Sequence, residues 1–139
     1  MSGWPKGLIP NLTHPFKYSG DGLSHSWMAQ RVIEGWIFEN PRSGYPFGSN
    51  FMDYPGSDSG NLLILKLLGL ATTDYHSALN LFFLLSFPAI FVASFCTLNS
   101  LGLNKILSFS ASFLFVFQSF HFTRLDHTFY LWYLSLIHI

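Results

Sequence analysis

Hydrophobic and polar positions divide the chain at residue 74. No Asp, Glu, Lys or Arg occurs from Tyr75 to Asn104, whereas charges recur throughout the segment before it. As a helix, the uncharged run from 75 to about 98 would measure about 36 Å, which exceeds a hydrocarbon core of about 30 Å. A second uncharged run, 106–123, would measure about 27 Å. The pattern therefore predicts two membrane spans, joined by a short break at 99–105 into a transmembrane helical hairpin.

The edges of this region carry further signals. Asp74 stands where it can cap the first span, and Pro88 predicts a kink of the kind that membrane helices tolerate. From Thr128 to Ile139 the chain is apolar and helical in character, but these residues would cover only about 18 Å. We therefore expect a truncated further span from 128, so that 75–139 forms a transmembrane region.

Residues 1–74 are predicted to form a polar and aromatic head. Prolines and glycines before Asp21 indicate an extended segment, and the proline-free stretch that follows predicts a helix at 22–38, with the Asp21 carboxylate as its N-cap. Positions 40–60 are rich in turn-forming residues and predict a loop, in which interleaved aromatic residues indicate order. The leucine-rich segment 61–70 is too short to span and predicts an interfacial helix along the bilayer surface.

Composition narrows the class of protein. Half of the 139 residues are apolar and only 10% are charged, against roughly 25% in an ordinary soluble domain, which excludes a water-soluble globule. A net charge of zero without a basic cluster argues against nucleic acid as a partner. The single cysteine, Cys96, excludes an intrachain disulfide framework, and its place in the apolar run predicts a buried packing role.

The orientation of the head rests on two observations. Residues 1–10 lack the basic and apolar regions of a signal peptide, so either the head is cytoplasmic or a hydrophobic helix precedes it. Lys105 is the only charge in the turn between the spans, and the positive-inside tendency favours a cytoplasmic turn with an extracytoplasmic head. Because two spans return the chain to its starting side, residues 121–127 are expected in the same compartment as Asp21.

The first candidate for chemistry is Asp21, which lies between Gly20 and Gly22, with His25 one helical turn later. A substrate hydroxyl can closely approach a carboxylate flanked by glycines, which suits a general base or a metal ligand. The alternative is a helix cap without chemistry, and the two roles can coexist.

A second candidate pair, Asp53 and Asp58, flanks a Pro-Gly turn, with Tyr54 directly after the first carboxylate. Their oxygens could hold a hard divalent cation, although the spacing matches no calcium-loop signature. As ordinary turn-forming residues they need no function.

A third candidate group follows the second span. If the helix continues there, His121, Arg124 and either His127 or Thr128 share one face at a spacing of three. Arginine offers a forked donor for phosphate oxygens, so this group suits a phosphate leaving group, while the alternative is that it only marks the water interface. Phosphate-cradling Gly-rich loops and nucleophile elbows are missing from the sequence, which argues against a nucleotide-dependent enzyme.

The chain carries four motifs in order: PFKYSGDG from Pro15, NPRSGYPFG from Asn40, DYPGSD from Asp53 and FHFTRLDH from Phe120. Together they resemble the amino-terminal region of bacterial polytopic membrane proteins related to the C-class, lipid-linked-sugar-dependent glycosyltransferases. The resemblance implies an all-α, multi-pass protein of the bacterial inner (plasma) membrane. In that class a first transmembrane helix precedes an extracytoplasmic loop-and-helix head, and an Asp early in that head acts near the acceptor and the metal.

By position, the Asp of the family corresponds to Asp21. The family's His and Arg at the outer end of a later span correspond to His121, Arg124 and His127, near the lipid phosphate.

These expectations combine into one predicted function. A sugar would pass from a polyprenyl-phosphate carrier in the lipid bilayer to an acceptor hydroxyl on the outer membrane face. Asp21 would activate the acceptor directly or through a divalent metal ion held with Asp53, and substrate binding is expected to involve His25, Tyr54 and Asp58. The alternative is a non-catalytic membrane protein, such as a lipid-sugar translocator or an assembly subunit.

Overall fold

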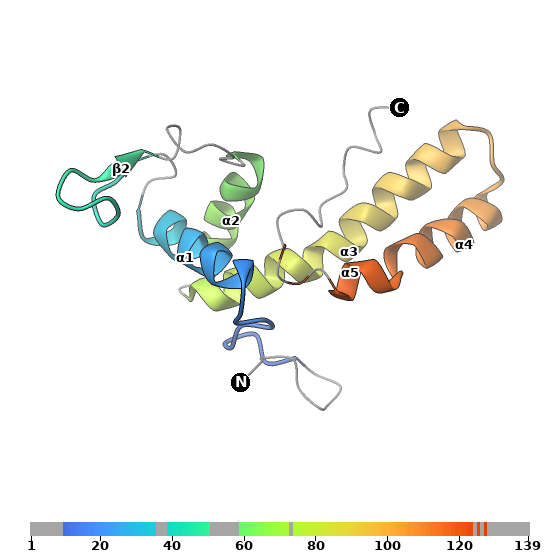
Figure 1. Cartoon of the computed structure of the whole chain (residues 1–139). Coiled ribbons are helices and arrows are strands. Elements are labelled where there is room, and N and C mark those ends of the chain that lie inside the picture. The colour runs from blue at the N-terminus through green and yellow to red at the C-terminus, as the bar shows by residue number, and fades with distance from the viewer. Residues whose placement is uncertain are drawn as a thin grey trace. The chain divides into compact units, whose positions relative to one another are not determined.

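The computed structural model describes residues 10–35, 39–50, 59–72, 74–123, 125 and 127. It is mostly helical, as predicted, and adds one small two-stranded sheet that the sequence did not predict. The elements in Figure 1 are α1 (Asp21–Glu34), β1 (Glu39–Asn40), β2 (Ser49–Asn50), α2 (Ser59–Ala71), α3 (Tyr75–Ser100), α4 (Lys105–Val116) and α5 (Ser119–Thr123). The chain divides into two compact units, Met1–Phe82 and Phe83–Ile139, which are described in turn.

In the first unit, α1 begins and ends at glycines. Gly20 is the N-cap, with a φ of 54° that glycine adopts without strain. Asp21 is therefore the first helical residue, and the prediction that it occupies the N-cap position is wrong. Gly35 is extended and ends α1 at Glu34 rather than at the predicted residue 38; positions 36–38 lie outside the described residues.

A β-hairpin occupies much of the predicted loop. β1 and β2 pair antiparallel, with Glu39 opposite Asn50. The turn between them requires Gly44, which has a φ of 72° and whose substitution would place a Cβ 2.3 Å from the Gly48 carbonyl oxygen. The predicted loop thus contains a short β-hairpin that the sequence did not indicate, and residues 51–58 of the loop lie outside the described residues.

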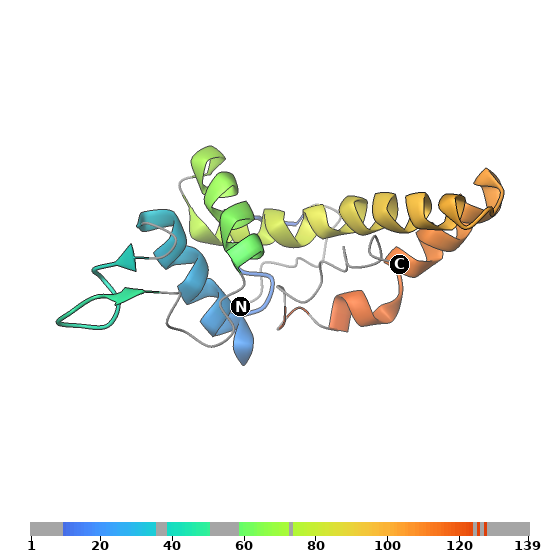
Figure 2. The ribbon, with the colours of Figure 1, turned by 90° about the horizontal axis from the view of Figure 1, so that it is seen from above.

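α2 confirms the predicted helix at 61–70 and packs on α1 (Figure 2). Leu65 on α2 and Val32 on α1 are fully buried between them. Close approach depends on Gly69, because a Cβ at this position would lie 2.7 Å from Cγ1 of Ile33. Another face of α2 exposes three leucines, which are Leu63, Leu67 and Leu70. The orientation of this face toward a bilayer stays a prediction.

Two helical stretches are long and apolar enough to cross a membrane, judged by length and composition. They are Tyr75–Ser100, with 26 residues and a mean hydropathy of 2.2, and Lys105–Thr123, with 19 residues and a mean hydropathy of 1.3. Asp74 caps the first of them as predicted, since its Oδ2 accepts a hydrogen bond from the Ser77 N–H at 2.8 Å. α3 continues through Pro88 as one helix, and the kink stays a prediction.

The second stretch is not one continuous helix. α4 ends at Val116, residues 117–118 leave the helical path, and α5 begins at Ser119. The predicted span at 106–123 agrees in length and composition with Lys105–Thr123, and the interruption at 117–118 lies within it. At its start, α4 is capped by Asn104, whose side-chain oxygen accepts a hydrogen bond from the Leu107 N–H at 2.8 Å.

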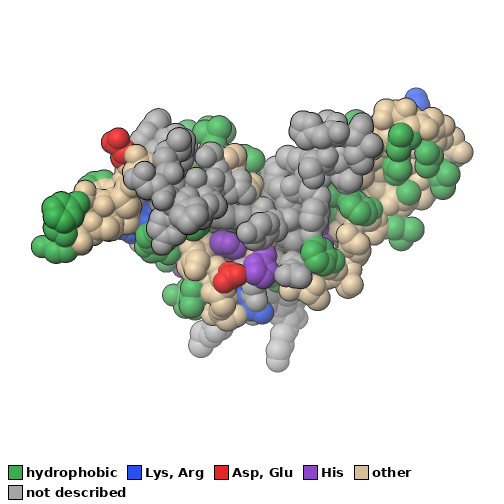
Figure 3. All heavy atoms as spheres, turned by 45° about the horizontal axis from the view of Figure 1, so that its top comes forward, with side chains coloured by type: hydrophobic (Ala, Val, Ile, Leu, Met, Phe, Trp, Pro, Cys, Tyr) green, Lys and Arg blue, Asp and Glu red, His purple; other side chains and the backbone are tan. Residues whose placement is uncertain are grey.

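Large apolar side chains lie exposed along α3 and α4, as Figure 3 shows for one face. They include Leu85, Val92, Ile106, Phe109 and Leu114. Cys96 is exposed one turn after Val92, so the buried packing role predicted for this cysteine is wrong. Exposed apolar helix faces of this kind are expected where lipid replaces water.

Candidate functional site

Asp21 lies exposed at the start of α1, directly after a tight turn. The Gly22 N–H donates to the Ser19 carbonyl at 3.1 Å, and the Leu23 N–H donates to the Gly20 carbonyl at 3.2 Å. Gly22 is buried, and a Cβ there would lie 3.3 Å from the Lys17 carbonyl oxygen. The two glycines therefore hold the chain compactly on both sides of the carboxylate.

His25 lies one turn further along α1, but its surroundings differ from those of Asp21. The imidazole is only 8% exposed. Its neighbour Ser26 is also buried and donates to the Gly22 carbonyl at 2.8 Å. The His25 side chain therefore lies in the core of the first unit. Its contribution to substrate binding stays a prediction.

The segment before α1 is fastened to α3 through Asn80. We call residues 12–16 the strap. The Asn80 amide nitrogen donates to the carbonyls of Leu12 at 2.7 Å and His14 at 2.8 Å, and its oxygen accepts from the Phe16 N–H at 3.3 Å. Sequence reasoning missed this residue; its only signal was an amide inside a largely apolar run.

The far end of α1 is fastened to α2 through Lys66. Its ammonium group donates to the carbonyls of Val32 at 3.0 Å, Ile33 at 3.2 Å and Gly35 at 2.5 Å. A cation at this place satisfies carbonyls that no longer have helical partners and complements the negative end of the helix dipole. In the sequence, the only signal for this helix-capping role was a single lysine among leucines.

An exposed charge cluster surrounds Glu34 at the end of α1. Its carboxylate accepts hydrogen bonds from Gln30 at 2.8 Å, Arg31 at 2.7 Å and Arg42 at 3.2 Å. The hydrogen bond from Gln30, followed by the charges of the two arginines, holds the pKa of Glu34 below its ordinary value. Because the cluster is solvated, we assign it a structural role of small energy.

In the second unit, His121 is buried rather than presented at a surface. It is 1% exposed, its Nε2 lies 2.8 Å from the Ser86 hydroxyl, and the Phe87 ring centroid is 4.2 Å from its own. The Ser86 hydroxyl donates its one hydrogen to the Phe83 carbonyl at 2.6 Å, so it must accept from His121. This arrangement assigns the Nε2–H form to the imidazole.

The other predicted site residues fall into two classes. His127 is half-buried in the second unit. The remaining four lie outside the described residues; they are Asp53, Tyr54, Asp58 and Arg124. The structure thus brings Asp21 and His25 into the first unit and His121 and His127 into the second. Within the described ranges, no three His, Cys, Asp or Glu side chains gather as metal ligands.

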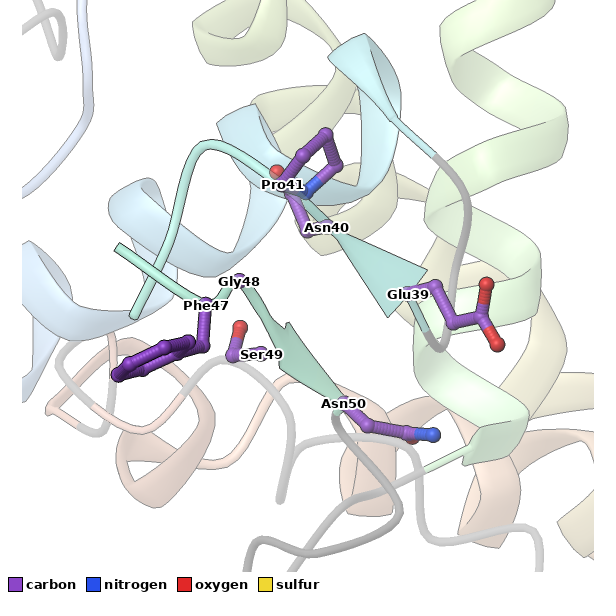
Figure 4. Close-up of a pocket in the computed structure, with 7 residues that line it drawn as sticks. All are labelled: Glu39, Asn40, Pro41, Phe47, Gly48, Ser49 and Asn50. Carbon is purple, nitrogen blue, oxygen red and sulfur yellow. The ribbon is translucent and has the colours of Figure 1, made fainter. Parts of the chain in front are cut away.

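The β-hairpin carries a shallow hollow lined by Glu39, Asn40, Pro41, Phe47, Gly48, Ser49 and Asn50. Figure 4 shows that the side chains of Glu39 and Asn50 point to one side of the ribbon and that of Phe47 to the other. A single small ligand would therefore not meet both the carboxylate and the ring. At the tip of the hairpin, Tyr45 and Phe47 are 95% and 96% exposed, and we call this pair the aromatic tip.

Comparison with protein-family models, curated proteins and solved structures finds no match to this chain. The functional argument therefore rests on the residues and their geometry.

Proposed function

We propose that the chain is part of an integral membrane glycosyltransferase of the C-class kind, which transfers a sugar from a polyprenyl-phosphate carrier to an acceptor on the outer membrane face. The observation that carries the proposal is the exposed carboxylate of Asp21 between two glycines at the start of α1. Lys66 binds the carbonyls at the C-terminal end of this helix, and Asn80 binds the segment that precedes it. Two stretches fit for membrane crossing and the order of the four motifs support it.

In the proposed reaction, the acceptor hydroxyl oxygen attacks the anomeric carbon of the donor sugar. The bond between that carbon and the phosphate oxygen breaks, and its electron pair leaves with the polyprenyl phosphate. Asp21 takes the hydroxyl proton and later releases it to water. Arg124 and His127 stabilise the departing phosphate. A contact from His121 would require its ring to leave the buried position beside Ser86.

A divalent cation fits this proposal only as an aid to Asp21. It would be held by Asp21 with Asp53, and it would lower the pKa of the acceptor hydroxyl. Carboxylate oxygens are suitable ligands for such a cation.

The test is Asp21→Asn in the complete reading frame that contains these residues, purified and reconstituted in liposomes. The probes are polyprenyl phosphates carrying radiolabelled glucose, mannose, galactose or arabinose, and the readout is release of polyprenyl phosphate. Loss of a general base lowers such a rate by about 10²-fold or more, whereas Glu39→Gln, an exposed carboxylate of the hairpin, should leave it unchanged. Full activity of Asp21→Asn would refute the catalytic role.

The rival is a non-catalytic membrane subunit whose head binds a partner, and the aromatic tip favours it. Two aromatic rings exposed on an ordered turn leave apolar area in water, which is typical of an interaction surface. On this reading Tyr45→Ser with Phe47→Ser would abolish copurification of a partner, while Asp21→Asn would change nothing. The glycosyltransferase proposal expects the opposite pattern.

The orientation can be tested with single cysteines, because Cys96 is the only native one. In a Cys96→Ser background, Phe47→Cys and Lys105→Cys would be treated with a membrane-impermeant maleimide on intact cells. An extracytoplasmic head predicts labelling at position 47 alone, with labelling at 105 only after permeabilisation. The reverse pattern would show a cytoplasmic head.

A further inference from the structure

The Asn80 carboxamide is fully engaged in holding a distant segment. It is 3% exposed, and both of its amide hydrogens and its oxygen bond to the strap, which lies 64 to 68 residues earlier in the chain. The Ser77 hydroxyl, one turn earlier on α3, lies 3.3 Å from the Leu12 carbonyl, although its one hydrogen is shared with the closer Asp74 carboxylate at 2.8 Å. Phe16, the last strap residue, is 5% exposed and belongs to the apolar core.

The position of Asn80 along α3 gives these contacts a physical reason. The 26 residues of α3 measure about 39 Å, about 9 Å more than a hydrocarbon core. About six residues can therefore lie outside the core, and residues 75–80 are the polar start of the helix. Asn80 is the last of them, and burying its amide without partners would be costly. The carbonyls of the strap supply those partners.

The strap leads directly to Asp21. Only four residues, 17–20, lie between Phe16 and Asp21, and the last two belong to the tight turn closed by the Gly22 and Leu23 N–H groups. On the far side of the carboxylate, α1 is fixed by Lys66. Asp21 is therefore separated from the hydrogen-bonded strap by only a short stretch of chain.

We propose that Asn80 is a positioning residue for Asp21: it clamps the strap to the outer end of α3 and so fixes where the Asp21 carboxylate meets the acceptor. The proposal rests on the catalytic role proposed for Asp21. A displacement of about 1 Å in a reacting group can lower a rate by about 10²-fold, so a clamp of this kind matters for turnover.

The test combines strap release with turnover in the complete protein. Strap release is measured in detergent micelles as the rate of tryptic cleavage after Lys17, which directly follows the strap, relative to cleavage after Lys105. Asn80→Ala should raise the relative cleavage rate at least tenfold and lower kcat by about 10²-fold. The matched control is Asn99→Ala at the other end of α3, which should change neither value.

Two further variants separate positioning from general loss of structure. Asn80→Asp keeps the oxygen that accepts from Phe16 but loses both donors, so it should behave like Asn80→Ala. Ser77→Ala removes the longer contact with the Leu12 carbonyl, together with a hydrogen bond to Asp74, and should give smaller changes in the same direction. Retained helical circular dichroism shows that the variants fold.

The outcomes distinguish this proposal from the proposed function. Unchanged cleavage after Lys17 in Asn80→Ala would overturn the clamp. A released strap with unchanged kcat, alongside an inactive Asp21→Asn, would overturn positioning and leave the catalytic role intact. An active Asp21→Asn would remove the catalytic role and the positioning role together.

Discussion

Replacement of Lys66 by methionine tests what fixes α1 on α2. Methionine keeps an unbranched apolar stem of similar length and a similar helix propensity, but it removes the ammonium group. Three carbonyls, those of Val32, Ile33 and Gly35, then lose their donor at 3.0, 3.2 and 2.5 Å. The change therefore removes the capping interaction with little loss of packing.

The magnitude follows from opposing contributions. Hydrogen bonds from a charged donor contribute about 1.5–3 kcal/mol each, and a partly buried cation at a helix C-terminus contributes up to about 2 kcal/mol. Against this, ordering a lysine side chain costs up to about 2 kcal/mol, and water can reach some of the freed carbonyls. We expect Lys66→Met to destabilise the pairing of α1 with α2 by about 2 kcal/mol.

Native-state hydrogen exchange of α1 amides in detergent micelles measures this directly. A loss of about 2 kcal/mol corresponds to exchange that is about 30 times faster. The control is Lys105→Met, an exposed lysine at the start of α4, whose effect on α1 should be negligible. Exchange in α1 that changes less than threefold in Lys66→Met, or changes equally in Lys105→Met, would refute the capping argument.

The remaining predictions concern α2 and the start of α3. Gly69→Ala should destabilise the folded protein by about 1–3 kcal/mol, because the added Cβ would lie 2.7 Å from Cγ1 of Ile33. Gly60→Ala in the same helix places its Cβ where nothing lies within 4 Å, so it should stabilise the fold by up to about 1 kcal/mol. Thermal unfolding compares the two, and equal effects would contradict the packing. Burial alone would raise the pKa of Asp74, but the hydrogen bonds from the Ser77 N–H and hydroxyl outweigh it and hold the pKa below the ordinary value. Because the folded-state pKa is lowered, this stabilisation is complete above the ordinary Asp pKa of about 4 and is lost as pH falls through the folded value. In Asp74→Asn, the free energy of unfolding should therefore fall less steeply as the pH is lowered below about 4. An unchanged pH dependence would show that the carboxylate does not contribute to stability.

Local signals predicted the two long apolar helical stretches better than they predicted the ends of elements. Charge depletion from Tyr75 onward located α3, and Asp74 was correctly identified as its cap. The prediction failed at α1, where Gly20 rather than Asp21 took the N-cap position. The span at 106–123 was located, but no proline, glycine or charge marks the interruption between α4 and α5 within it.

In the candidate site, features that depend on neighbours in the chain were predicted, and features that depend on distant residues were not. The exposed carboxylate between glycines was visible in the sequence, since it depends on neighbours in the chain. The burial of His121 was not visible, because it depends on Ser86, which lies 35 residues away. The exposure of Tyr45 and Phe47 was likewise unpredicted, since aromatic content indicates order without stating what covers the rings.

The sequence by itself determined that this chain is mostly helical and where its apolar helices run. These properties depend on hydrophobic length and on local backbone chemistry. Only the tertiary structure decided which residues hold the C-terminal end of α1 and the segment before it. Asn80 and Lys66 were single polar residues in apolar runs, and their roles depend on carbonyls at least 31 positions away. Hydrogen bonds over such separations are set by packing, which no local pattern encodes.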